Sequence, residues 1–69
     1  MSIIRIENAE MFVGMDELRA RTEVIDHGYD CRIVFRDGRT LHFDLRPDYD
    51  PLRVNLHVTA GKVTKATIG

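Results

Sequence analysis

The sequence has one cysteine and three histidines, side chains that can act as nucleophile, base or metal ligand: Cys31, His27, His42 and His57. A reactive thiol–imidazole pair needs an exposed cysteine in an electropositive environment. Cys31 instead alternates along the chain with Ile33 and Phe35, which predicts that it packs as a small buried hydrophobe. The histidine and cysteine spacings match no zinc pattern. We therefore expect no metal and no cofactor.

The other polar motifs also lack a catalytic set. Ser2 is the only serine, and it lies close to the chain terminus, where backbone order is lowest. The run Asp48-Tyr49-Asp50 offers two carboxylates but lacks the glycine and the distal glutamate of a calcium loop. No glycine-rich phosphate-binding loop is present. These observations predict a protein that binds a partner and is not an enzyme.

Length and composition narrow the class of protein further. The chain has 69 residues, which corresponds to a single domain over 1–69, and its 43% hydrophobic and 30% charged content is typical of a globular protein. A formal net charge of −1 argues against nucleic-acid binding. One cysteine permits no internal disulfide, which favours a cytoplasmic location. The first seven residues have the character of neither a signal peptide nor a membrane span, so no membrane partner is expected.

Hydrophobic periodicity predicts one helix and several strands. Asp16 is a suitable N-cap and Gly28 a suitable C-cap, which predicts a helix over roughly 16–27, with Leu18, Thr22 and Ile25 on one face. Alternating apolar residues predict a short first strand over 4–7 and further strands over 31–36, 41–45, 53–58 and 63–68, the last of them at a sheet edge. This order predicts an α+β fold in which one helix packs on a small mixed β-sheet.

The segment over residues 38–58 is the most informative part of the sequence. It contains both prolines and lies between strong strand signals. Proline fixes φ and lowers the entropy of a loop. Because a rigid loop loses little entropy on binding, this segment has the character of a binding loop.

Several short motifs occur in a fixed order along residues 9–69. They are Val13-Gly14, Asp37-Gly38, the run His42 to Asp48, Arg53-Val54-Asn55-Leu56, Gly61-Lys62-Val63-Thr64 and Ile68-Gly69. In this order and spacing the chain resembles the potato inhibitor I type of serine protease inhibitor, and in particular its bacterial and fungal elastase-inhibitor-like branch. The resemblance implies a potato inhibitor I-like fold with strands 31–36 and 53–58 parallel, and a serine protease of the chymotrypsin or subtilisin type as the partner.

The same resemblance implies which residues form the site. The substrate-like loop would comprise Phe43, Asp44, Leu45, Arg46, Pro47 and Asp48. In one alignment frame the scissile bond is Phe43–Asp44, and in a second frame it is Pro47–Asp48; the first keeps the six-residue step from Gly38 to Asp44. Arg46 and Arg53 would support the loop from beneath, with the Gly69 carboxylate as their partner. The sequence departs from the branch at Ile68, where the branch has a disulfide-forming cysteine, and in an apparent insertion over 49–52.

Strand patterning supports a competing interpretation of the same segment. If Asp37-Gly38-Arg39 is a three-residue hairpin loop, Phe35 faces Leu41 and Ile33 faces Phe43, so the apolar side chains share one sheet face. Phe43 would then belong to the core, and the exposed loop would begin after Leu45. The alternative function is a non-inhibitory protein-binding or self-associating module, a monomer or weak homodimer, whose contact is loop 46–52 or the last strand.

Overall fold

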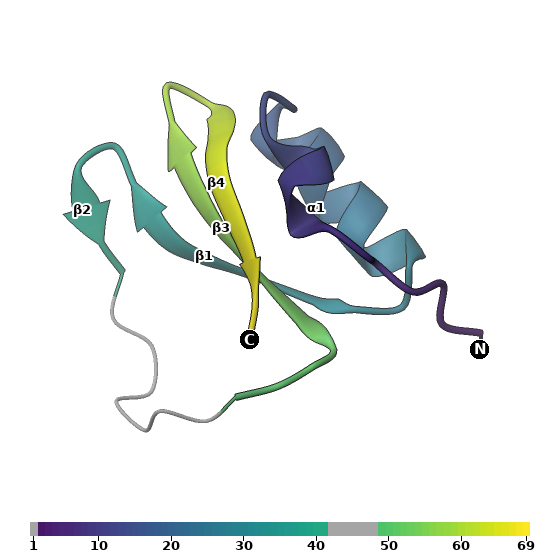
Figure 1. Ribbon diagram of the computed structural model, residues 1–69. Helices are drawn as coiled ribbons and strands as arrows, with labels where there is room; N and C mark the ends of the chain where they lie inside the picture. The colour runs from purple at the N-terminus through teal and green to yellow at the C-terminus, as the bar shows by residue number, and fades with distance from the viewer. Residues whose placement is uncertain (1, 42–48) are drawn as a thin grey trace.

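The computed structural model describes residues 2–41 and 49–69. One helical layer packs on one face of a single four-stranded sheet (Figure 1). The elements in chain order are η1 (Ala9–Phe12), α1 (Glu17–Asp26), β1 (Asp30–Arg36), β2 (Arg39–Thr40), β3 (Arg53–Thr59) and β4 (Lys62–Ile68). The predicted α+β fold, with one helix on a small mixed sheet, is therefore confirmed.

The sheet has the strand order β2-β1-β3-β4. β1 and β3 pair in parallel at its centre, as predicted, and β4 pairs antiparallel with β3 at one edge. A parallel pair needs a long connection, and here it runs from Arg36 to Arg53 and includes the short strand β2. The segment expected to bind a partner therefore follows β2 at its upstream end and leads into β3 at its downstream end.

The core lies between the sheet and the helices. Its largest fully buried side chains come from both layers: Phe12, Val24, Val54, Leu56, Val58 and Val63. In β3 these valine and leucine residues alternate with residues that face away from α1, as expected of a strand covered on one side. β3 is consequently the strand that contributes most to the core.

Helix α1 begins one residue after Asp16, close to the predicted boundary, but its buried face differs from the prediction. Leu18 and Ile25 are 76% and 56% exposed, whereas Ala20 and Val24 are fully buried. The small Ala20 side chain allows the helix to lie close to the sheet, which turns the larger residues outward. The prediction of a Leu18–Ile25 packing face is therefore wrong.

The first strand predicted over residues 4–7 is also wrong, because that segment joins no sheet. It is held instead by single hydrogen bonds: the Ile4 N–H donates to the His27 carbonyl at 2.9 Å, and the Ile6 N–H donates to the Tyr29 hydroxyl at 3.1 Å. Gly28, with φ of 87°, lies directly beneath Ile3, where a Cβ would come within 3.2 Å of Ile3 Cγ1. The N-terminal segment therefore needs glycine at this helix end.

The hairpin after β1 has a different register from the one predicted. Phe35 pairs with Thr40, and Arg36 with Arg39, so the loop comprises only Asp37 and Gly38. Both loop residues have positive φ, 51° and 82°, as a two-residue type I′ turn requires. The three-residue loop is therefore wrong; strand β2 ends at Thr40, and residues 42–45 lie outside the described part of the chain.

A bulge in β1 explains why Ile33 and Phe35 do not share one sheet face, as the alternation of apolar residues had predicted. The register with β3 shifts between Ile33 and Phe35, which leaves Val34 as an extra residue. Beyond this bulge Phe35 lies opposite His57 on the face away from α1, and the two rings stack with centroids 5.6 Å apart. Phe35 therefore leaves the face that Ile33 occupies, contrary to the prediction.

Candidate functional site

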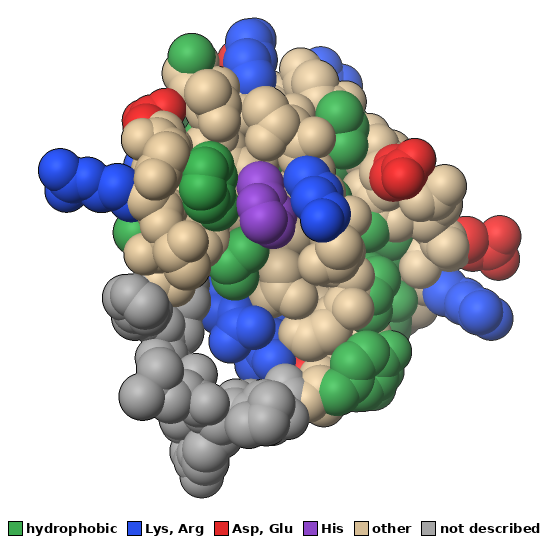
Figure 2. All heavy atoms as spheres, turned by 60° about the vertical axis from the view of Figure 1, so that its left-hand side comes forward, with side chains coloured by type: hydrophobic (Ala, Val, Ile, Leu, Met, Phe, Trp, Pro, Cys, Tyr) green, Lys and Arg blue, Asp and Glu red, His purple; other side chains and the backbone are tan. Residues whose placement is uncertain are grey.

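The open face of the sheet, the one away from α1, carries the polar groups of β1, β3 and β4. Figure 2 shows a histidine near the middle of this face, with an apolar and a basic side chain beside it. The register identifies the neighbours of His57 as Phe35 on β1 and Lys65 on β4. Among residues 2–41 and 49–69, no helix covers this face, and the side chains of Lys65 and Thr67 on it are exposed.

At one end of this face a hydrogen-bonded network joins three strands. The Arg53 guanidinium Nε donates to the Gly69 carbonyl oxygen at 2.8 Å, and the Asn55 amide Nδ2 donates to the same oxygen at 3.0 Å. The Gly69 N–H in turn donates to the Arg53 carbonyl at 2.9 Å. Arg32 on β1 donates from Nε to Asn55 Oδ1 at 3.0 Å. We call these four residues the Gly69 network.

Asn55 is the centre of the Gly69 network. It is only 9% exposed although it faces away from the helix, and both ends of its amide are hydrogen-bonded. An amide buried with either end unsatisfied would cost about 1–3 kcal/mol. The bond from Arg32 fixes the amide orientation, because only an oxygen can accept it, and this directs Nδ2 to Gly69.

The segment that leads into β3 is fixed to this network. Asp50 Oδ1 accepts from the Leu52 N–H at 2.9 Å, and the Arg53 N–H donates to the Asp50 carbonyl at 3.2 Å. Aspartate first and proline second, as in Asp50-Pro51, is the favoured composition of a type I turn. The Leu52 carbonyl accepts from the Asp30 N–H at 2.8 Å, which ties the turn to β1. The downstream end of the connection is thus hydrogen-bonded both within itself and to β1.

The sequence-predicted site falls into two parts. Loop residues Phe43, Asp44, Leu45, Arg46, Pro47 and Asp48 lie outside the described residues. Of the expected supports, Arg53 and Gly69 are brought together, and Arg46 lies outside the described residues. Sequence reasoning missed Asn55 and Arg32. The sequence carries no clear signal for them, because both residues occupy the polar positions of alternating strands, where an exposed side chain is expected.

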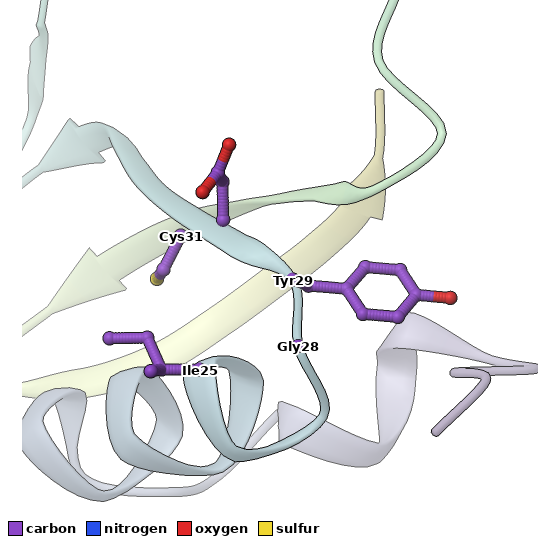
Figure 3. A pocket seen from close by; sticks show the side chains of 5 residues that line it. Ile25, Gly28, Tyr29 and Cys31 are labelled. Carbon is purple, nitrogen blue, oxygen red and sulfur yellow. The ribbon is translucent and has the colours of Figure 1, made fainter. Parts of the chain in front are cut away.

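Cys31 lies at a second surface, between β1 and the end of α1. A groove of about 520 Å³ is lined there by Ile25, Gly28, Tyr29, Asp30 and Cys31. In Figure 3 the Cys31 thiol and the Ile25 side chain point toward one another, while Tyr29 extends away from them. Cys31 is half-buried, and burial raises the pKa of its thiol. A thiol with a raised pKa has little thiolate at neutral pH, so this geometry disfavours nucleophilic chemistry.

Within residues 2–41 and 49–69, no three His, Cys, Asp or Glu side chains form a group that could hold a metal ion. No helix in the same ranges has the length and apolar character needed to cross a membrane. No family model, curated protein or solved structure matches the chain.

Proposed function

We propose that this chain is a serine protease inhibitor that acts through a substrate-like loop against a chymotrypsin- or subtilisin-type protease. The observation that supports it best is the Gly69 network at the foot of the connection between parallel strands β1 and β3. An inhibitor of this kind must hold both sides of its scissile bond in place after attack. A network that fixes the downstream side is suited to that task.

The chemistry of such inhibition depends on rigidity. A protease binds the loop in extended form, with one side chain in its primary pocket, as it would bind a substrate. The protease serine attacks the scissile carbonyl and displaces the amine of the leaving segment, which gives an acyl-enzyme. If that segment cannot diffuse away, its amine attacks the ester, the peptide bond re-forms, and the ester bond breaks to release the serine hydroxyl. Arg53 and Asn55, joined through the Gly69 oxygen, restrain the start of β3 and therefore the segment that would carry that amine.

The decisive experiment is a titration of chymotrypsin- and subtilisin-type proteases with the wild-type chain and with Phe43→Gly. If Phe43–Asp44 is the reactive bond, the wild type inhibits stoichiometrically and Phe43→Gly weakens inhibition about 100-fold or more, because one anchor in a deep pocket carries much of the binding energy. Leu18→Ala, a truncation of an exposed apolar residue on α1, serves as the control and leaves inhibition unchanged.

Mass spectrometry of the slowly hydrolysed complex then identifies the cleaved bond. A cut at Phe43–Asp44 supports the first alignment frame, and a cut at Pro47–Asp48 supports the second. A folded wild-type chain that inhibits neither protease class would exclude the inhibitor function.

The second candidate is a non-inhibitory protein-binding or self-associating module on the same scaffold. It is favoured by a specific observation at the sheet edge: part of β4 has no backbone partner among the described residues on its outer side. A thermal melt beside the protease titration separates the two candidates. The module predicts no inhibition, together with a lower melting temperature for Phe43→Gly if Phe43 contributes to the core.

A further inference from the structure

The outer edge of β4 exposes a short row of backbone groups. In an antiparallel ladder, alternate residues turn their N–H and C=O toward the partner strand and the others turn them away. Gly69 bonds to Arg53 across this ladder, and the same alternation continues through Thr67 opposite Asn55 and Lys65 opposite His57. Ala66 and Ile68 therefore turn their N–H and C=O to the outer edge.

The first part of that edge is covered by the chain itself. The Val63 N–H donates to the Met15 carbonyl at 2.9 Å, and the Val63 carbonyl accepts from the Gly14 N–H at 2.8 Å. Asp16 continues this cover with a bridge to Lys62. The cover ends there. Among residues 2–41 and 49–69, no backbone group outside the ladder pairs with Ala66 or Ile68.

A hollow lies next to the uncovered part of β4. It has a volume of about 560 Å³ and is lined by Glu10, Val13 and Thr64–Thr67. Its wall opposite the strand is formed by η1 and the residue that follows, and Val13 there is 45% exposed. A further strand placed against β4 would gain backbone hydrogen bonds and apolar contact with Val13 together.

We propose that this edge binds a second copy of the chain, through antiparallel pairing of β4 with β4 about a two-fold axis. The edge is self-complementary when Ala66 pairs with Ile68 of the second copy, because both residues present outward N–H and C=O groups. Each such pair exchanges both hydrogen bonds. This register spans residues 65–69, so it does not compete with the cover over Val63.

The side chains in this register are compatible with close approach. Thr67 lies opposite Thr67 of the second copy, and threonine pairs are favourable across antiparallel strands. Lys65 lies opposite Gly69 of the second copy, so the two lysines do not face each other. This dimer rests on the self-associating module proposed above and is independent of the inhibitor function, because it uses only β4 and Gly69.

A charge-swap experiment tests both the interface and its register. Sedimentation equilibrium of the wild type, over about 0.05 to 2 mM, should show a monomer–dimer equilibrium, as expected of a small interface. Thr67→Glu and Thr67→Lys should each weaken association about 10-fold, because like charges then meet on the axis. An equimolar mixture of these two variants should associate at least as well as the wild type. Thr40→Glu, an exposed threonine on β2 at the other sheet edge, should change nothing.

The variants alter an exposed side chain, so the fold is retained, and a thermal melt of each confirms it. A wild type that stays monomeric up to about 2 mM would overturn the proposal. The alternative occupant of the edge would then be an extended segment of another protein. Association that Thr67→Glu leaves intact, or that the mixture fails to restore, would overturn this register and place the interface elsewhere.

Discussion

The two faces of β3 are built from neighbouring residues yet hold the protein together in different ways. Val54, Leu56 and Val58 are fully buried against the helical layer, and their contribution depends on shape and apolar area. Asn55 and His57 point the other way, into hydrogen bonds and a ring stack that depend on register. The covered face therefore buries the apolar area of β3, whereas the open face carries the hydrogen bonds that hold strand ends in position.

The largest expected effect tests the covered face. Leu56→Ala should lower the free energy of unfolding by about 2–5 kcal/mol, because it removes a fully buried side chain and leaves a cavity. His57→Ala, one residue along on the open face, should cost about 0.5–1.5 kcal/mol through loss of its stack on Phe35. Urea denaturation of both variants measures the difference. Equal losses would show that the two faces do not differ as described.

The next effect tests the Gly69 network on the open face. Asn55→Ala should cost about 1–3 kcal/mol, because the Gly69 oxygen and the Arg32 Nε–H each lose this partner in a buried setting. Asn55→Asp keeps an acceptor for Arg32 but removes the donor to Gly69, so it separates the two bonds. Thr59→Ala, an exposed residue of the same strand, is the control and should stay within about 0.5 kcal/mol of the wild type. A loss for Thr59→Ala as large as that for Asn55→Ala would contradict the assignment.

A smaller and more local effect is expected at Arg53. Arg53→Ala removes a charge-assisted hydrogen bond to the Gly69 oxygen, which should speed amide exchange in residues 49–52 about 10-fold. Exchange in residues 54–58 should change much less, because the ladders on both sides of β3 remain. Arg39→Ala on exposed β2 is the matched control. Equal acceleration in both ranges would mean that Arg53 contributes general stability.

The smallest effect concerns the exposed contact between Asp16 and Lys62. The hydrogen bond from Lys62 holds the pKa of the Asp16 carboxyl below its ordinary value of 3.8. A lowered folded-state pKa stabilises the protein above the ordinary value, and that contribution is lost as the pH falls through the lowered pKa. The stability difference between wild type and Lys62→Met should therefore shrink between about pH 5 and about pH 2. A Lys65→Met control should show no such trend, and a constant difference for Lys62→Met would refute the link to Asp16.

The fold was largely predictable because its main signals are local. Asp16 and Gly28 flank the helix as predicted, although the Asp16 side chain makes no capping hydrogen bond and accepts from Lys62 instead. The alternation in residues 53–58 marks β3, whose apolar side chains are the most deeply buried of any strand. The predictions that were wrong concern features that tertiary contacts determine. Periodicity cannot show that Val34 is an extra residue in β1, nor that α1 packs through Ala20 and not through Leu18.

The site was predictable only in part. The pairing of Arg53 with Gly69 was expected from the family resemblance, and the two residues do meet. The roles of Asn55 and Arg32 depend on the register between β1 and β3, which no local pattern specifies. The proposed reactive residues over 43–48 remain a prediction that the protease titration must decide.

The central position of β3 also determines how the chain can fold. β1 has its main partner in β3, with β2 and the whole connection between them in sequence, so the first half of the protein cannot complete its sheet alone. Pairings between distant segments slow folding, because chain entropy is lost before the contacts form. During synthesis, α1 and β1 would emerge from the ribosome before residues 53–59, so β1 could not pair with β3 until those residues had been made. We therefore expect the rate-limiting step of folding to be the pairing of β3 with β1, because β3 and β4 are joined by a short turn and can pair locally.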